Sequence, residues 1–403
     1  MGSIALLGLA LGSPELKLKE ADHKKLSKLV GDYYTAMDEE KGIQESLSKI
    51  VESIKDTEKR LKNQKLLAAV SDWEQVFWYV QLDYLKESLK SKGKIDQFKT
   101  KDASGMDVAF AYSLPKSYLA KKGPFPLVIT VPGEGEKPAA HLESTWNDPA
   151  LREGALLIAL QMAPNASAWG TFGSKDSPGG VFSIMNALGV VQRELAIDFN
   201  RIFLAGSGKG FEAAAATAAA FPQVFAGLVG IGDVSACDMR NFRSLPTLFL
   251  KGGDGVKKMQ TQLNELGFAN TTELAEGGVA DAWSWIGKTR RDPYPTQISF
   301  FPTSDAARRA HWIALDGMQV AEEPHVEAMV DRASNTITID TQKVSDIVIY
   351  LNDVLVDMDK PVKFVVNKTP HEQTVERNAV EMIQLQYHSG DWGRVFTGYV
   401  KVP

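Results

Sequence analysis

The sequence contains a glycine-rich turn whose residue spacing is typical of a nucleophile elbow. Residues 203–211 read Phe-Leu-Ala-Gly-Ser-Gly-Lys-Gly-Phe. An apolar, β-rich run at 201–205 leads into the turn, and an alanine-rich segment at 211–220 follows it. A strand, a sharp turn and a helix in this order place the serine of Gly-x-Ser-x-Gly where its hydroxyl can react. This turn is therefore the candidate position for a reactive hydroxyl.

Two alignments of this motif compete at the turn. The residues two before and two after the centre must be small, because the strand and the helix crowd there. With Gly208 at the centre both flanks are glycine, whereas with Ser207 at the centre one flank is Lys209, which fits poorly. A central glycine also relieves the backbone strain of the turn. We favour the Gly208 alignment, in which the nucleophile position carries no side chain. A phosphate-binding loop is a further alternative, but it fits less well because the Walker pattern fails at two places.

The elements around the turn predict an α/β domain over residues 94–302. Short, continuously apolar runs alternate with helical segments, which is typical of a doubly wound sheet covered on both faces. The predicted strands are 95–100, 106–114, 124–131, 155–160, 201–205, 224–231 and 247–251, with helices at 182–195 and 211–220.

Different patterns on either side of this domain predict two further regions. Residues 1–93 form a helical region, because apolar residues between 15 and 92 recur at three- and four-residue spacing. Residues 303–403 form a small β-rich, sandwich-like module with antiparallel strands, interrupted by one helix at about 372–387. The predicted fold is thus an α/β sheet domain with an N-terminal helical region and a C-terminal β-rich module.

Residues 112–135, the turn at 206–210 and residues 221–229 resemble the dienelactone-hydrolase and esterase branch of the α/β-hydrolase superfamily and its prolyl-oligopeptidase-like relatives. The resemblance covers about residues 105–300. It implies ester or peptide cleavage through a serine, a histidine and an acid. Each of these three roles corresponds to a position in this sequence.

The family pattern places the acid after a late strand, where Asp254 follows two glycines, although a simple turn aspartate is an equal alternative. The histidine position corresponds to Ala280, so this role is vacant as well. His141 is the most plausible displaced histidine, although a structural role is favoured for every histidine in the chain. Of the three catalytic positions, the nucleophile and the base are therefore both degenerate.

Further residues are expected around the mouth of this site. The loop after the strand at 124–131 would supply oxyanion N–H groups; it contains Gly133, Glu134 and Gly135, and its glutamates would oppose a developing negative charge. Lys209, Asp281 and Trp283 are expected near the same mouth. Such a cleft would suit a small polar or peptide ligand, and a collapsed pocket is the alternative.

Composition excludes several other classes. A net charge of −5 over 403 residues gives no reason to expect nucleic acid, and no run of residues is long and apolar enough to span a membrane. One cysteine, Cys237, excludes an internal disulfide and a multi-cysteine metal site, so we predict neither a metal nor another cofactor. The apolar residues 4–12 resemble the remains of an export signal, which favours a periplasmic or secreted location, or they form a tail that packs on protein.

These observations give two main hypotheses. The first is a non-catalytic protein with the α/β-hydrolase fold, acting as a binding or scaffolding component through the helices of 15–92 or the C-terminal module, with a partner protein or a second copy of the chain. The alternative is a serine esterase or peptidase that uses Ser207, Asp254 and a displaced histidine such as His141. A third, weaker idea is that the chain is one subunit of a larger assembly.

Overall fold

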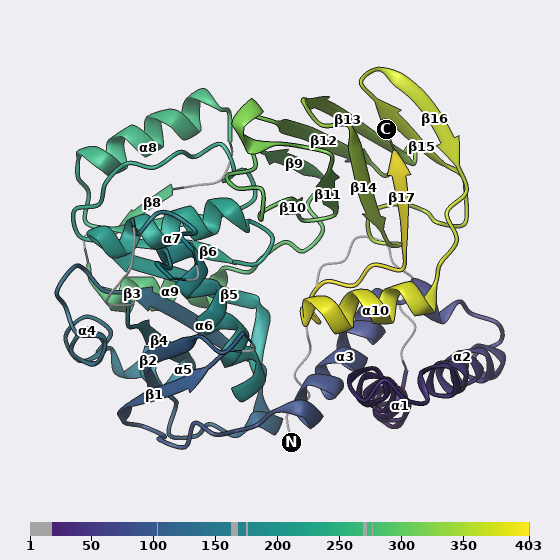
Figure 1. The fold of residues 1–403 in the computed structure, drawn as a ribbon, viewed down its shortest axis with the longest axis horizontal. Helices are drawn as coiled ribbons and strands as arrows, with labels where there is room; N and C mark the ends of the chain where they lie inside the picture. The colour runs from purple at the N-terminus through teal and green to yellow at the C-terminus, as the bar shows by residue number, and fades with distance from the viewer. Residues whose placement is uncertain are drawn as a thin grey trace. The chain divides into compact units, whose positions relative to one another are not determined.

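A mixed sheet of eight strands lies at the centre of the predicted α/β domain in the computed structural model, which describes residues 18–102, 104–162, 168–174, 176–268, 272–275 and 277–402 (Figure 1). Its order is β1-β2-β4-β3-β5-β6-β7-β8. β2 is antiparallel to β1 and β4, and the pairs from β4 through β3 to β8 are parallel. The bounds are Ile95–Lys101, Asp107–Ser113, Phe125–Val131, Leu156–Leu160, Ile197–Ser207, Gly227–Ile231, Thr247–Leu250 and Thr272–Ala275 for β1 to β8.

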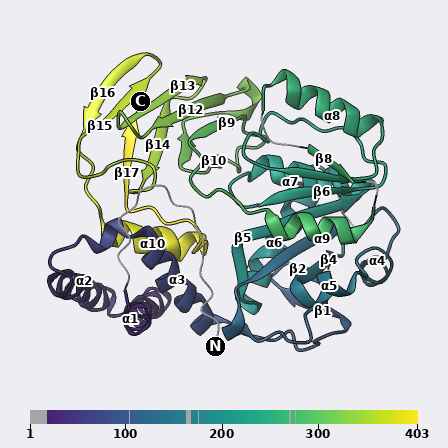
Figure 2. The same cartoon turned by 180° about the vertical axis from the view of Figure 1, so that it is seen from behind.

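Helices cover both faces of this sheet, as the sequence predicts for a doubly wound architecture (Figure 2). α4 (Pro138–Ser144), α5 (Pro149–Gly154) and α9 (Val279–Lys288) contribute to one face, and α6 (Gly180–Glu194) packs with α7 (Lys209–Ala220). α8 (Asp254–Glu265) follows β7. The doubly wound α/β sheet domain expected from the sequence is confirmed.

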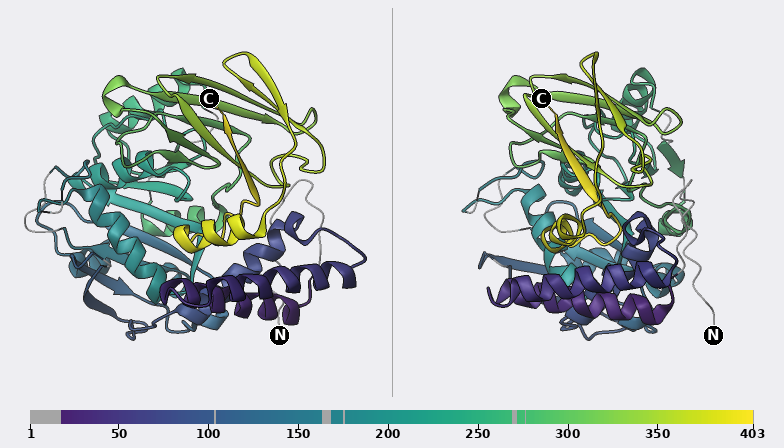
Figure 3. Two further views of the ribbon diagram at one scale, coloured as in Figure 1. Left: turned by 45° about the vertical axis from the view of Figure 1, so that its right-hand side comes forward. Right: turned by 90° about the vertical axis from the view of Figure 1, so that its right-hand side faces the viewer.

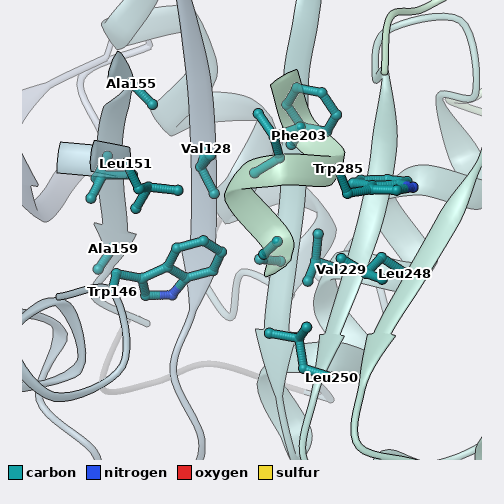
Figure 4. Close-up of a cluster of buried hydrophobic side chains, with 14 of the residues drawn as sticks. Val128, Trp146, Leu151, Ala155, Ala159, Phe203, Val229, Leu248, Leu250 and Trp285 are labelled. Atoms are coloured by element: carbon teal, nitrogen blue, oxygen red, sulfur yellow. The ribbon is translucent and has the colours of Figure 1, made fainter. Parts of the chain in front are cut away.

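Alternate residues of the buried strands form the core under α4, α5 and α9 (Figure 4). Trp146 and Leu151 meet Val128 and Ala159 there, and the ring of Trp285 lies 5.7 Å from that of Phe203. Every one of these side chains is almost entirely buried. Burying a large apolar side chain contributes about 1.5–3 kcal/mol, so this layer holds the sheet rigid beneath the turn that ends β5.

The chain divides into two units, each of which is described by itself. One takes in the chain up to Asp83, Met329–Asp340 and the chain from Val348; the other takes in Tyr84–Ala328 and Thr341–Ile347. The eight-stranded sheet belongs to the second unit. The division at residues 93 and 302 that the sequence suggests stays a prediction.

Three α-helices account for the predicted N-terminal helical region (Figure 3). They are α1 (Glu20–Asp38), α2 (Ile43–Arg60) and α3 (Val70–Tyr84), with the short turn η1 (Leu66–Ala68) before α3. Aromatic residues join this region to α10 (Ala379–Ser389) and the segment after it within the same unit. The rings of Tyr34 and Tyr387 lie 5.1 Å apart and are tilted by 59°, and Trp392 Nε1 donates a hydrogen bond to Gln81 Oε1 at 2.6 Å.

Strands β9 to β17 form two smaller sheets, of four and five strands. Their bounds are Gln297–Phe300, Arg309–Ala310, Ile313–Asp316, His325–Asp331, Thr336–Gln342, Asp346–Leu351, Val362–Val366, Thr369–Gln373 and Gly398–Val402; η2 (Ala120–Lys122) and η3 (Val320–Glu322) are short turns elsewhere in the chain. β15 pairs antiparallel with β16 but parallel with β13. The β-rich module is thus confirmed, whereas the prediction of purely antiparallel pairing is wrong.

The helix of this module begins later than predicted. Residues 372 and 373 belong to strand β16, and α10 begins at Ala379. The side chain of Asn378 accepts hydrogen bonds from the backbone N–H groups of Val380 and Glu381, which satisfies the first donors of the helix. The predicted start at residue 372 is therefore wrong, because this cap sets the boundary.

Candidate active site

The turn after β5 has Gly208 at its tip. β5 ends at Ser207 and α7 begins at Lys209, so one residue joins the strand to the helix. Gly208 has φ +50° and ψ −125°, a region of backbone conformation that side chains rarely tolerate. This is a sharp strand-to-helix turn of the kind that presents a nucleophile. Here the residue that is presented carries only hydrogen.

The two flanking glycines are required by close packing. A Cβ atom on Gly206 would lie 2.5 Å from the carbonyl oxygen of Gly210, and one on Gly210 would lie 2.1 Å from the carbonyl oxygen of Val131. A Cβ atom on Gly208 would meet nothing within 4 Å. The crowded positions are therefore those two before and two after Gly208, as the Gly208 alignment predicts.

Ser207 is half-buried at the end of β5 and turns toward the loop after β3. Its Oγ would lie 3.6 Å from a Cβ atom on Gly133, the first glycine of the predicted oxyanion loop. No hydrogen bond of Ser207 Oγ to a histidine occurs among the described residues. A serine without a general base loses about 10⁴-fold or more of its rate. Ser207 therefore lies at the right loop without an activating partner.

An ion pair joins the elbow to the oxyanion loop. Lys209 Nζ lies 2.6 Å from Glu134 Oε2. Both side chains are about half exposed or more, so the pair contributes at most about 1 kcal/mol. Its effect is local, because the ammonium group of Lys209 offsets the negative charge of Glu134. From the sequence alone that charge had no expected partner. The loop itself is closed by a hydrogen bond from Glu136 N to Gly133 O, with Gly135 at φ +81°.

His141 belongs to a buried hydrogen-bond network behind this loop. Its Nδ1 lies 3.0 Å from Glu136 Oε2, and its Nε2 lies 2.9 Å from Thr130 Oγ1. The indole N–H of Trp146 is shared between Thr130 Oγ1 at 3.1 Å and Nε2 at 3.2 Å. Because Nδ1 faces a carboxylate oxygen, which can only accept, Nδ1 carries the proton and Nε2 accepts. The side chain is 1% exposed. Both ring nitrogens are occupied by structural partners.

Burial lowers the pKa of His141, although the neighbouring Glu136 carboxylate raises it in part. Its folded-state pKa thus lies below the ordinary value of 6.5, and the unfolded chain takes up the proton first. The stability from this group is present in full above about pH 6.5 and is lost as the pH falls toward the folded-state pKa, by up to about 1.4 kcal/mol per pH unit. We expect His141→Gln to flatten this acid-side loss in urea unfolding at pH 7.5 and 5.5. Parallel pH profiles for the two proteins would contradict this.

The remaining predicted residues lie elsewhere in the same unit. Asp254 is the first residue of α8, and its side chain is 92% exposed, with Lys257 as its ion-pair partner at 3.5 Å. Ala280 and Asp281 lie in the first turn of α9. Trp283, further along α9, packs on Gly154 of α5, where a Cβ atom would strike its ring at 2.2 Å. The contacts of the described residues thus gather Gly133, Glu134, Ser207, Gly208 and Lys209, and they do not link Asp254 or His141 to Ser207.

Two features of this region carry no clear signal in the sequence. Asp233 follows β6 and approaches the turn after β7, since its Oδ1 would lie 2.5 Å from a Cβ atom on Gly253. A pocket of about 590 Å³ lies beside α7 and has Phe211, Glu212 and Cys237 in its wall. Its lining comes from six separate stretches of chain between residues 170 and 320, so no local pattern could reveal it.

No protein-family model matches the sequence, and no curated protein is similar to it. Solved structures that resemble part of the chain include a thermostable esterase, with 18% identity and a TM-score of 0.40. The match covers 49% of this chain and 64% of the esterase chain, which is less than two thirds of that chain. A ferulic acid esterase (11%, 0.40) and an S-formylglutathione hydrolase from Staphylococcus aureus (13%, 0.38) each match 48% of this chain, and 97% and 98% of their own. These similarities concern fold alone. None of the described helices is long and apolar enough to cross a membrane.

Proposed function

We propose that this chain, whose sheet domain has the α/β-hydrolase fold, is a non-catalytic member of that fold that acts as a binding or scaffolding component. The observation that carries the proposal is the backbone of Gly208, at φ +50° and ψ −125°, on the tip of the elbow. A residue in this position holds the attacking group in an active hydrolase. Glycine offers none.

The other catalytic roles support the same proposal. His141 hydrogen-bonds with Thr130 and Glu136, so both of its ring nitrogens are already engaged away from Ser207. Asp254 points into solvent, where it orients no imidazole among the described residues. An elbow without a side chain and without a base can still bind a ligand, because backbone N–H groups remain at the N-terminus of α7.

One observation favours the alternative, a serine esterase or peptidase that uses Ser207. Its Oγ lies beside the Gly133 loop, where an oxyanion would be held. This alternative requires an imidazole within about 3 Å of that oxygen, directly or through one water. His141 would have to leave its buried network to supply it.

Labelling with a fluorophosphonate probe separates the two proposals. We expect no labelling of the protein and no turnover of p-nitrophenyl acetate above that of the Ser207→Ala variant, whose elbow is otherwise unchanged. Labelling of the wild type that Ser207→Ala abolishes would establish the esterase. A partner that co-purifies with the full chain, or a dimer in light scattering, is the expected sign of the binding role.

A further inference from the structure

Three sulfur atoms meet where the segment after β6 packs on α8. Cys237 Sγ lies 3.4 Å from Met259 Sδ and 3.6 Å from Met239 Sδ. Cys237 and Met239 belong to the segment after β6, and Met259 lies on α8. The segment is fixed to the helix by a hydrogen bond of 3.0 Å from Met239 N to Gln262 Oε1. The three sulfurs are thus held together by two elements of one unit.

The ligand chemistry of this cluster is soft. Thiolate and thioether sulfurs favour Cu(I), whereas Zn(II), Mg(II) and Ca(II) require additional thiolate, imidazole or oxygen ligands. No group of three His, Cys, Asp or Glu residues that could hold a metal occurs in the described part of the chain. A cluster built on two methionines is of a different kind. Met239 and Met259 are 0% and 1% exposed, so their thioethers face no water that would compete with an ion.

We propose that Cys237, Met239 and Met259 form a binding site for one Cu(I) ion. On binding, the S–H bond of Cys237 breaks, a sulfur–copper bond forms, and the proton goes to solvent. The two thioethers complete a three-coordinate site through their lone pairs. Copper enters and stays as Cu(I), so the step needs neither an oxidant nor a reductant.

The geometry needs only a small adjustment. Three sulfurs at about 2.3 Å from one ion lie about 4.0 Å apart, so the observed separations of 3.4 and 3.6 Å must open by about half an ångström. Methionine has three rotatable bonds and accommodates such shifts at low cost. Cys237 Sγ is therefore near the separation from each methionine sulfur that a shared ion would impose.

The cluster borders a pocket that offers an entry path, and the Asp238 carboxylate beside it is paired with Arg240 Nη2 at 2.6 Å. Cys237 is half-buried and lines the pocket of about 590 Å³ beside α7, with the exposed Asp238 next to it. Bound metal deprotonates a coordinating thiol outright, so affinity should rise with pH as a proton is released.

Anaerobic Cu(I) titration against the chromophoric chelator bicinchoninate tests the site on the full-length protein. We expect one Cu(I) per chain, complete loss of this binding in Cys237→Ser, and a weakening of about tenfold or more in Met259→Leu. Met382→Leu, another fully buried methionine, belongs to the other unit and should bind as the wild type does. Absence of copper binding, or binding that survives Cys237→Ser, would overturn the proposal.

X-ray absorption of the copper-loaded wild type keeps the test independent of any variant. Three sulfur scatterers near 2.3 Å and none of nitrogen or oxygen are expected. A first shell that contains nitrogen would place the ion on histidines and refute this site. Neither outcome depends on whether Ser207 is a nucleophile, since both measurements report on the metal alone.

Discussion

Replacing Gly210 by alanine is expected to cost more than about 3 kcal/mol of the free energy of unfolding, at or beyond the upper end of the cost of overpacking. The added Cβ would lie 2.1 Å from the carbonyl oxygen of Val131 and 2.5 Å from that of Pro132. Both are backbone atoms at the end of a central strand, so no side chain can rotate away. Either α7 must move off the sheet or β3 must shift. Urea unfolding followed by far-UV circular dichroism measures the loss.

Gly208→Ala is the matched control for this experiment. Its Cβ meets nothing within 4 Å, so the only cost is a side chain at φ +50° and ψ −125°, about 1–3 kcal/mol. The same atom added two residues apart should therefore have clearly different effects. Equal losses in the two variants would mean that the sheet and helix do not approach at Gly210, and the assignment of Gly208 to the tip would fail with it.

This pair of substitutions shows how much of the site could be read from the sequence. The rule that strand and helix crowd two residues either side of the tip is local, so it selects Gly208 over Ser207 without any structure. The sequence signal for the parallel strands is equally local. Runs such as 125–131 and 156–160 are continuously apolar, and they are buried along almost their whole length. Burial on both faces of a sheet removes the alternation that would otherwise leave the assignment ambiguous.

Other parts depend on contacts that no local pattern carries. β8 has four residues and β10 has two, too few for periodicity to register, and neither was expected. His141 resembled a displaced base because it follows the oxyanion loop, but its partner Trp146 and its neighbour Thr130 decide its role. Met259 reaches Cys237 only because α8 folds back along the segment after β6.

A side chain at the tip of the turn would not by itself restore catalysis. A serine at position 208 would find open space for its Cβ, at the backbone cost already given for alanine. It would still lack an imidazole, because Ala280 has no proton-accepting group and His141 is buried in its own network. A hydroxyl alone at the tip would therefore add a hydrogen-bonding group and no nucleophile activated by a base.

Arg377→Met is expected to be the second large loss, about 3–5 kcal/mol, in the unit that contains α1 to α3 and α10. Arg377 donates through Nε to Asp353 Oδ2 at 2.8 Å and through Nη1 to Asp359 Oδ1 at 2.7 Å; Nη2 donates to Asp353 Oδ1. The side chains of Arg377 and Asp353 are 10% and 7% exposed. Without the guanidinium group, the Asp353 carboxylate stays buried with its charge uncompensated.

The partner Lys65 provides the control, because it pairs with Asp359 on the same side of the unit but is more than half exposed. Lys65→Met should cost less than about 1 kcal/mol. The double variant Arg377→Met, Asp353→Leu removes both buried charges and should recover a substantial part of the loss, since replacing a whole buried pair is often close to neutral. Thermal or urea unfolding of the three variants gives the values. If the double variant is no more stable than Arg377→Met, the loss comes from packing of the arginine stem, and the uncompensated charge of Asp353 is not its cause.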